Sequence, residues 1–140
     1  MSLSNLSCNV EDVTQLSFPS SSIPSLSCMH VIEHIGLGRY GDPINSDGDV
    51  LAAKELMGVL GENGYLLIVV PVAETQAIRF NAHRIYNLKG VLSLFSELEL
   101  IEFSFLNETK DNQFVRFAKE TDVIGSKYGC GCFVFQKKKS

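Results

Sequence analysis

The sequence predicts an α/β domain built on a mostly parallel sheet, and three segments support this prediction. Residues 65–70 form a nearly continuous aliphatic run that ends at Pro71, a pattern typical of a strand covered on both faces. Residues 50–60 place apolar side chains at helical spacing just before that run. Residues 26–32 form another short apolar segment, bounded by turn-forming residues. Because a strand, a helix and a strand follow one another, the two strands are expected to lie parallel in one sheet.

The predicted helix over residues 50–60 has a start signal and a stop signal. Asp49 is the expected N-cap, because its side chain can accept a hydrogen bond from a free N–H group of the first turn. Gly61 and Gly64 are expected to end the helix before the strand over residues 65–70.

The second half of the chain predicts a short helix and two strands. Residues 88–95 are the helix candidate. Residues 98–106 alternate apolar and polar side chains apart from one slip near Ile101, which predicts a strand with a β-bulge. Residues 130–136 predict a last strand, and we expect the two closing strands to be antiparallel neighbours. Residues 107–128 are polar and show no clear pattern.

Length and composition indicate one globular domain over residues 1–140. The 140 residues are 45% hydrophobic and include 9 Phe, enough for a sizeable core. The net charge of -4 comes from interspersed acidic and basic residues, so no nucleic-acid partner is expected, and the lysines at 137–139 are predicted to be a solvated tail. No apolar run approaches the roughly 20 residues that span a bilayer, so no membrane association is expected.

The cysteines indicate a reducing, cytoplasmic setting. There are 4 of them, and three lie in apolar, strand-like surroundings where a free thiol behaves as a small hydrophobe. Cys130 and Cys132 are separated by one residue, so they lack the spacer of a redox motif or a zinc knuckle. We therefore expect both to be buried strand residues.

The stretch HVIEHIGLGRYGDP, residues 30–43, matches two known patterns. Its HxxEH start fits inverted zinc peptidases, which need His30 and His34 on one face of a helix together with a distant third ligand. Only about one turn here can be helical. Its three glycines fit GxGxxG, but no helix opens after the last glycine to hold a phosphate. No metal is predicted, and a zinc hydrolase using His30 and His34 is kept as a remote alternative.

Several stretches together resemble one enzyme superfamily. In chain order, VEDVTQLSF (10–18), SLSCMHVIEHI (25–35) and DVLAAKELMGVLGENGYLLIVVP (49–71) resemble the second half of class I S-adenosylmethionine-dependent methyltransferases. GLGRYGDPINSDGD (36–49) and RFNAHRIYNLKG (79–90) resemble an uncharacterised branch of that superfamily, a domain of unknown function. The resemblance implies a Rossmann-like methyltransferase fold with a mostly parallel sheet and an antiparallel C-terminal strand.

The resemblance also implies that S-adenosylmethionine is the cofactor and that three residues bind it. Asp12 matches the acid whose carboxylate accepts a hydrogen bond from the adenine amino group, which suits an acceptor-only side chain. Val13 matches the residue whose backbone N–H meets the adenine ring. His30 matches the residue at the end of the family's fourth strand, facing the reactive methyl group.

An acceptor site is implied beyond that strand. His34 is the candidate catalytic base, because its ordinary pKa lies near neutrality, and a structural role for it is equally open. Glu33 is expected to be structural. Two loops are expected to bind a polar acceptor such as a sugar hydroxyl or a carboxylate, through Arg39, Tyr40, Asp42, Asn81, His83, Arg84 and Tyr86.

Relative to the family, the chain starts at about the third strand. The glycine-rich loop and the ribose-binding acid that form the family's main cofactor cradle have no counterpart in the sequence. We therefore expect a truncated domain that lacks the first two strands and is incomplete or inactive alone. The alternative is a non-catalytic interaction or assembly subunit. In either case a second copy or a partner chain is expected to cover the open sheet edge.

Overall fold

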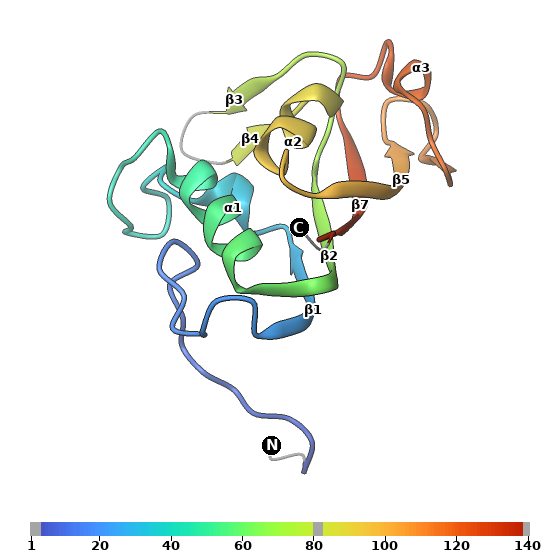
Figure 1. The fold of residues 1–140 in the computed structure, drawn as a ribbon. Helices are drawn as coiled ribbons and strands as arrows, with labels where there is room; N and C mark the ends of the chain where they lie inside the picture. The colour runs from blue at the N-terminus through green and yellow to red at the C-terminus, as the bar shows by residue number, and fades with distance from the viewer. Residues whose placement is uncertain (1–3, 80–82, 139–140) are drawn as a thin grey trace.

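The computed structural model describes residues 4–79 and 83–138, which form a sheet with helices packed against it (Figure 1). The elements in order are β1 (Ile23–Met29), the 3₁₀ helix η1 (Ile32–His34), α1 (Gly48–Val59), β2 (Leu60–Pro71), β3 (Ala77–Arg79), β4 (His83–Ile85), α2 (Leu88–Leu94), β5 (Glu99–Asn107), β6 (Gln113–Val115), α3 (Glu120–Val123) and β7 (Gly129–Gln136). Every helix and strand that the sequence predicted is present, with ends shifted by a few residues.

The main sheet has the strand order β1-β2-β7-β5-β6. β1 and β2 are parallel, whereas β7 is antiparallel to both of its neighbours, β2 and β5. β1, β2 and β5 therefore run in one direction, and the last strand of the chain inserts between two earlier ones. The predicted α/β, Rossmann-like class with an antiparallel C-terminal strand is confirmed, and so is the antiparallel pairing of the two closing strands.

Short elements and one irregularity complete the comparison with the sequence. The register of β5 shifts between Leu100 and Glu102, which confirms the bulge predicted near Ile101. β3, β4, β6 and α3 were not predicted. They are only 3 or 4 residues long, and such segments carry too little periodicity to be recognised.

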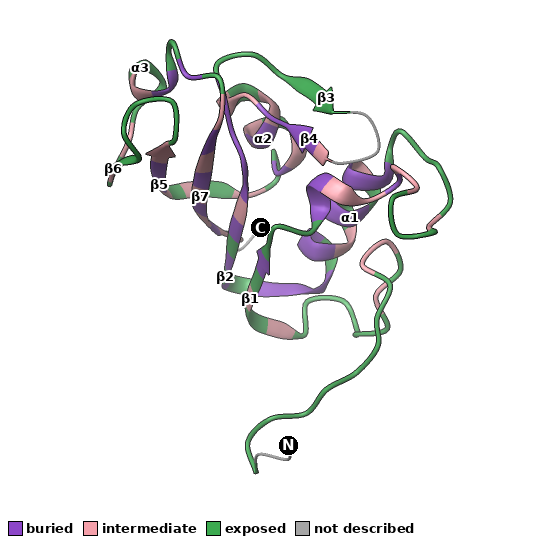
Figure 2. Cartoon of the chain, turned by 180° about the vertical axis from the view of Figure 1, so that it is seen from behind, coloured by how far each residue is buried: buried purple, intermediate pink, exposed green. Residues whose placement is uncertain are grey.

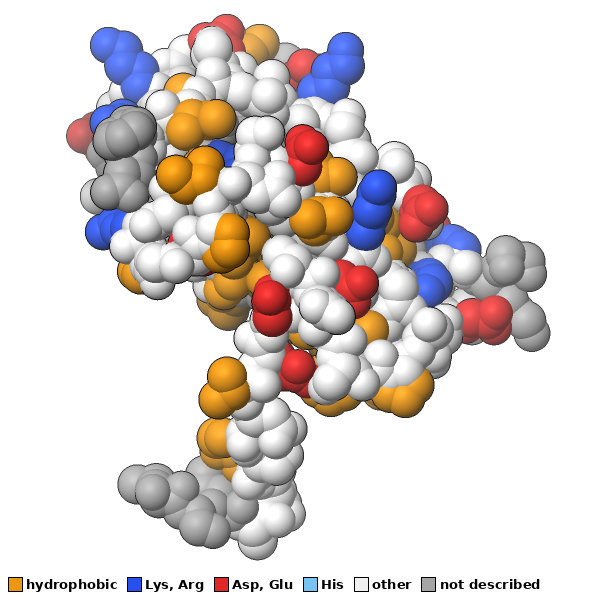
Figure 3. Space-filling model, turned by 90° about the vertical axis from the view of Figure 1, so that its left-hand side faces the viewer, with side chains coloured by type: hydrophobic (Ala, Val, Ile, Leu, Met, Phe, Trp, Pro, Cys, Tyr) orange, Lys and Arg blue, Asp and Glu red, His pale blue; other side chains and the backbone are white. Residues whose placement is uncertain are grey.

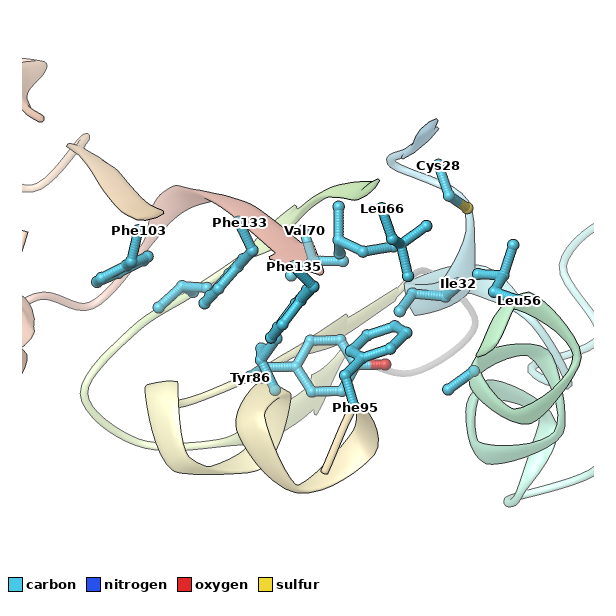
Figure 4. Packing of buried hydrophobic residues seen from close by; sticks show 14 of the residues in the cluster. Cys28, Ile32, Leu56, Leu66, Val70, Tyr86, Phe95, Phe103, Phe133 and Phe135 are labelled. Carbon is cyan, nitrogen blue, oxygen red and sulfur yellow. The ribbon is translucent and has the colours of Figure 1, made fainter. Parts of the chain in front are cut away.

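The core lies between the sheet and the two longer helices, α1 and α2 (Figure 4). Alternate residues of β2 and β7 point to this side, since Leu66, Phe133 and Phe135 are at most 1% exposed. The rings of Phe133 and Phe135 are stacked with their centroids 5.9 Å apart, and Phe95 follows α2 and lies 5.1 Å from Phe135. Such large rings bury more apolar area per residue than aliphatic side chains do.

The opposite face of β1 and β2 is open, which corrects the prediction that residues 65–70 are covered on both faces. Met29, Tyr65 and Leu67 are 61%, 44% and 41% exposed. The exposed residues along these strands appear as green bands in Figure 2. The aliphatic run was misleading because its outward positions carry apolar side chains although no described element covers them.

The start of α1 differs from the sequence prediction. The helix begins at Gly48, and Asp47 occupies the N-cap position, so the prediction that Asp49 is the cap is wrong. Asp49 is 7% exposed and its carboxylate turns inward to a buried hydroxyl, described below. A side chain at Gly48 would bring a Cβ to 2.8 Å from the backbone oxygen of Ile35, so glycine permits this close approach. Gly61 lies inside β2 rather than in a loop, since the strand starts directly after the helix.

Residues 4–10 are exposed and form a tail that extends away from the body of the molecule (Figures 1 and 3). Val10, for example, is fully exposed. Among the helices of the described residues, none has the length and apolar character needed to cross a membrane.

Candidate functional site

The candidate site forms where β1 ends. The backbone N–H of His30 donates to the carbonyl of Val69 at 2.9 Å, and His30 then adopts a positive φ of 56°. Positive φ is uncommon for residues other than glycine, and such strain clusters at functional sites. This turn leads directly into η1, which confirms the single helical turn predicted here. The segment therefore lies at the carboxyl ends of parallel strands, where α/β sheets bind ligands.

Glu33 lies beneath this turn as a buried carboxylate. Its side chain is 1% exposed, and its Oε1 atom is 3.2 Å from Nδ1 of His30 and 3.7 Å from Nε2 of His34. Its second oxygen, Oε2, is buried and has no hydrogen-bond partner among the described residues. Glu33 therefore holds two imidazole rings at the end of β1.

Six side chains form a row across the site, which we call the ring array. In order they are Arg39, Tyr40, His34, His83, Tyr128 and Arg79, with successive separations of 5.6, 5.8, 6.0, 5.9 and 6.0 Å between ring centroids or between a guanidinium carbon and a ring. The ring pairs meet edge to face, as aromatic pairs prefer. A guanidinium group stands at each end. The structure thus brings together His34, Arg39, Tyr40 and His83, all four of which the sequence had placed at one site.

His83, in the middle of the ring array, is half-buried. Burial, followed by the charges of His34 and Arg79, lowers the pKa of His83 below its usual 6.5. Its Nε2 atom is buried and makes no hydrogen bond within residues 4–79 and 83–138. A neutral imidazole can either donate or accept through such a nitrogen. His83 is therefore a candidate for direct contact with a bound molecule.

Arg84 and Tyr86 make buried polar contacts next to the turn after β1. Arg84 is 5% exposed, and its guanidinium donates to the backbone oxygen of Ile35 at 2.6 Å. Its Nε atom is 3.6 Å from Asp49, whose Oδ2 also accepts a 2.8 Å hydrogen bond from the Tyr86 hydroxyl. The sequence predicted that Arg84 and Tyr86 bind the acceptor. That role stays a prediction. Their buried polar groups also tie the turn after β1 to α1, which is a positioning role.

A cavity of about 450 Å³ links the predicted cofactor and acceptor residues. Asp12, His34, Tyr40 and Asp42 are in its wall, and its size lies in the range of small-molecule sites. A larger hollow of about 630 Å³ is lined mainly by β3, β4 and α2, and Arg84 and Tyr86 are in its wall. We regard the smaller cavity as the site because it alone of the two contains His34.

Asp12 and Asp42 are both engaged locally. One oxygen of Asp12 accepts hydrogen bonds from the hydroxyl and the backbone N–H of Thr14 at 2.6 and 2.9 Å, and these bonds lower the pKa of the Asp12 carboxyl below its usual 3.8. The carboxylate is thus ionised at neutral pH, as an adenine contact requires. Oδ2 of Asp42 accepts from the backbone N–H of Gly36 at 2.7 Å, which closes the loop on itself.

The remaining predicted residues are placed as follows. Val13 is half-buried and packs against the core, so its side chain is an anchor for the exposed segment that carries Asp12. The side chain of His30 is 51% exposed. Asn81 lies outside the described residues.

The sequence analysis missed three members of the site: Arg79, Tyr128 and Cys130. Tyr128 directly precedes β7 and Cys130 is the second residue of that strand, where it pairs with Pro71 at the carboxyl end of β2. The antiparallel insertion of β7 between β2 and β5 brings them there. The sequence predicted the strand over residues 98–106 as an antiparallel neighbour of the last strand, but it did not predict β2 as the other neighbour.

No group of three or more His, Cys, Asp or Glu side chains is arranged to hold a metal ion in the part of the chain that the structure describes. Nδ1 of His30 and Nε2 of His34 both lie within 4 Å of the same carboxylate oxygen, Oε1 of Glu33.

Comparison with known proteins identifies a family. Residues 9–128 match the family described as Caenorhabditis protein of unknown function, DUF268. No curated protein matches the chain.

Solved structures share its fold at low sequence identity. A SAM-dependent methyltransferase of Methanosarcina mazei is 14% identical with a TM-score of 0.62, covering 94% of this chain and 67% of its own. The methyltransferase bound to the Trm112 methyltransferase activator of Haloferax volcanii is 14% identical with a TM-score of 0.63, covering 100% of this chain and 64% of its own. The [4+2]-cyclase SpnF is 11% identical with a TM-score of 0.63, covering 94% of this chain and 57% of its own.

The chain thus spans about three fifths of the length of these proteins. The resemblance to class I methyltransferases is confirmed at the level of the fold. The cyclase shows that this fold also occurs in a protein whose name describes a different reaction, so the chemistry has to be argued from the site.

Proposed function

Because the chain belongs to the DUF268 family and has a class I methyltransferase fold, we propose that it is part of an S-adenosylmethionine-dependent methyltransferase that acts on a polar acceptor, either a saccharide or another small molecule. One observation carries the proposal. The buried Glu33 carboxylate holds His30 and His34 at the carboxyl end of β1, beside a cavity that also contains Asp12. Residues assigned to the cofactor side and to the acceptor side therefore border one space.

Each residue has a role in this proposal. Asp12 would accept from the adenine amino group, the backbone N–H of Val13 would meet the ring, and His30 would face the methyl group. When bound, S-adenosylmethionine supplies a methyl group activated by its sulfonium charge. His34 would take the proton of an acceptor O–H or N–H, because the Glu33 carboxylate stabilises the imidazolium that forms. Holding both reactants in line supplies much of the rate in such a transfer.

Acceptor binding is assigned to the ring array. The exposed guanidinium groups of Arg39 and Arg79 and the hydroxyl groups of Tyr40 and Tyr128 offer donors to hydroxyl or carboxylate oxygens. His83 offers a neutral nitrogen between them. A polar acceptor suits these groups better than an apolar one.

Calorimetric titration with S-adenosylhomocysteine tests the cofactor assignment. We expect binding, and Asp12→Ala should weaken it about tenfold, since a hydrogen bond to a charged group contributes about 1.5 kcal/mol. Glu62→Gln is the matched control, because Glu62 is an exposed acid at the opposite end of β2. Absence of heat at millimolar ligand would leave the chain without a cofactor site of its own.

A non-catalytic assembly subunit is the second candidate function, and the open sheet favours it. β1 is the edge strand of the described sheet, with a parallel partner on one side only. Such an edge, next to the exposed Met29 and Leu67, is a site for self-association or for a partner chain. Light scattering after gel filtration should show a dimer or larger species that Leu67→Lys disrupts and Glu62→Lys does not. A wild-type chain that remains monomeric at high concentration would contradict self-association.

A further inference from the structure

A thiol lies next to His30 and plays no part in the proposed methyl transfer. The Sγ atom of Cys130, the second residue of β7, is 3.8 Å from Nε2 of His30. The other ring nitrogen of His30, Nδ1, is 3.2 Å from Oε1 of Glu33. A thiol, an imidazole and a buried carboxylate therefore follow one another. In such an arrangement a base activates a nucleophile and a third group orients the base.

The carboxylate determines which nitrogen of His30 can take a proton. A carboxylate only accepts hydrogen bonds, so the ring proton lies on Nδ1, next to Glu33. In the neutral ring Nε2 is then an acceptor, and Nε2 is the atom that contacts the thiol of Cys130. The contact therefore has the direction that proton transfer from the thiol to the imidazole requires.

Glu33 provides independent support for a chemical role. It is one of the most deeply buried side chains of the protein, and its Oε2 atom lacks a hydrogen-bond partner in the described part of the chain. An incompletely paired buried carboxylate is costly, and purely structural sites seldom retain one. Beside a histidine that contacts a thiol, the carboxylate stabilises the imidazolium formed when the thiol loses its proton.

The thiol and the imidazole are both open to a small molecule. Alternate residues of β7 from Cys130 onward share the open face of the sheet with Tyr65 and Leu67 of β2. Cys130 and Cys132 are half-buried, which corrects the expectation that they are buried strand cysteines. The side chain of His30 is 51% exposed. A reagent can therefore approach the contact from this face.

We propose that Cys130 is a nucleophile, that His30 is the base that takes its proton, and that Glu33 positions this base. The start of β7 is then a covalent modification site for small carbon electrophiles. The site requires no bound cofactor, so it stands independently of the proposed methyltransferase activity.

The surroundings of the thiol keep it protonated until it reacts. The hydrogen bond with Cys132, burial and the nearby carboxylates of Glu108 and Glu33 raise the pKa of Cys130. Because the thiolate is the reactive form of cysteine, a thiol with a raised pKa reacts slowly at neutral pH unless a base takes its proton during the attack. His30 is the base in contact with this thiol.

The covalent step is a simple displacement with iodoacetamide as the probe. The sulfur of Cys130 attacks the methylene carbon, an S–C bond forms, and the C–I bond breaks with loss of iodide. The thiol proton passes to Nε2 of His30 and then to solvent, so no oxidant or reductant is required. The product is a stable thioether, and fragment-ion mass spectrometry distinguishes labelling of Cys130 from labelling of Cys132.

Labelling of the folded, full-length chain with iodoacetamide tests the proposal. General-base catalysis contributes about 10²–10⁴-fold, so His30→Asn should lower the Cys130 rate by about 100-fold. Asparagine is chosen because it tolerates the positive φ of this position and its amide does not take up a proton. Cys8 is exposed and should react equally in both proteins. Cys28 is the control for folding, because burial raises its pKa to about 11 and should keep it unlabelled.

The pH dependence separates base catalysis from a structural effect. Without a base, the rate of a thiol with a raised pKa increases about tenfold per pH unit between about pH 6 and about pH 9. The wild-type rate should rise less steeply, because His30 takes the proton. His30→Asn and Glu33→Gln should both become steeper, which a change in packing alone would not cause.

A decrease of less than about tenfold in His30→Asn, or faster labelling of Cys132 than of Cys130 in the wild type, would overturn the proposal. If Cys28 becomes reactive in His30→Asn, that variant has lost its fold, and the wild-type pH dependence then decides. A rise of about tenfold per pH unit in the wild type overturns base catalysis, and a shallower rise supports it. An unchanged pH dependence in Glu33→Gln would overturn the role of Glu33.

Discussion

Replacing Tyr86 with Phe removes one buried hydroxyl and leaves the rest of the side chain in place. Tyr86 is 4% exposed, and its hydroxyl donates to Oδ2 of Asp49 at 2.8 Å. Burial, with the Asp49 carboxylate, raises the pKa of this hydroxyl, so it remains a donor at every pH at which the protein is studied. In Tyr86→Phe the buried carboxylate keeps its longer contact of 3.6 Å with Arg84 and loses its short donor.

A hydrogen bond to a charged group contributes about 1.5–3 kcal/mol, so Tyr86→Phe should lower the free energy of unfolding by about 2 kcal/mol. For a chain of this length that corresponds to a decrease in Tm of about 7 °C. Urea denaturation followed by circular dichroism measures the change, and the denaturant dependence should stay the same because the native surface is unaltered.

Tyr65→Phe is the matched control, since Tyr65 is 44% exposed and its replacement should change stability by less than about 0.5 kcal/mol. The reasoning also requires that Tyr86→Phe has little effect in a chain that already carries Asp49→Ala. A loss below about 0.5 kcal/mol in Tyr86→Phe itself would show that the hydroxyl does not stabilise the site.

Three further predictions concern other parts of the structure. Gly36→Ala should lower the free energy of unfolding, measured by urea denaturation, by more than about 2 kcal/mol, because φ is 80° and the new Cβ would overlap the carbonyl oxygen of Asn45. Gly125→Ala is the control, since φ is 82° there but the space is open, and it should lower the free energy of unfolding by only about 1 kcal/mol. Phe133→Ala should lower the free energy of unfolding by about 3–5 kcal/mol, since Phe133 is 1% exposed. A smaller decrease would contradict the packing described. Folding lowers the pKa of His83, so the unfolded chain binds more protons than the folded chain below about pH 6.5. Falling pH should therefore destabilise the wild type more than His83→Gln. Denaturation series from about pH 7.5 to about pH 5 measure this difference.

The sequence predicted the longer elements because each carries enough periodicity to reveal its type. The helix before β2 and the bulge in β5 are examples, and the bulge was visible as one break in an alternating pattern. Asp49 shows where local rules fail. An acid at the start of a helix is ordinarily a cap, but here a tyrosine hydroxyl 37 residues away binds its carboxylate. Such a partner can be identified only after the sheet has brought β4 and α1 together.

For the candidate site, too, local patterns could be predicted from the sequence and long-range contacts could not. Residues of the turn after β1 could be predicted, because they are contiguous and follow a recognisable strand. Tyr128 and Cys130 could not, because they enter the site through the sheet order rather than through chain proximity. A last strand inserted at another place in the sheet would have left them far from His30.

The two sides of the site depend on different parts of the chain. The acceptor side is held by buried polar contacts within the body of the protein, above all the 2.6 Å hydrogen bond from Arg84 to Ile35. The residue assigned to adenine, Asp12, lies on an exposed segment anchored by Val13. Perturbing that segment should therefore weaken S-adenosylhomocysteine binding while leaving the geometry around Glu33 intact. Asp12→Ala should accordingly reduce calorimetric binding without changing the free energy of unfolding measured by urea denaturation, and a parallel loss of both would mean that the two sides form a single cooperative unit.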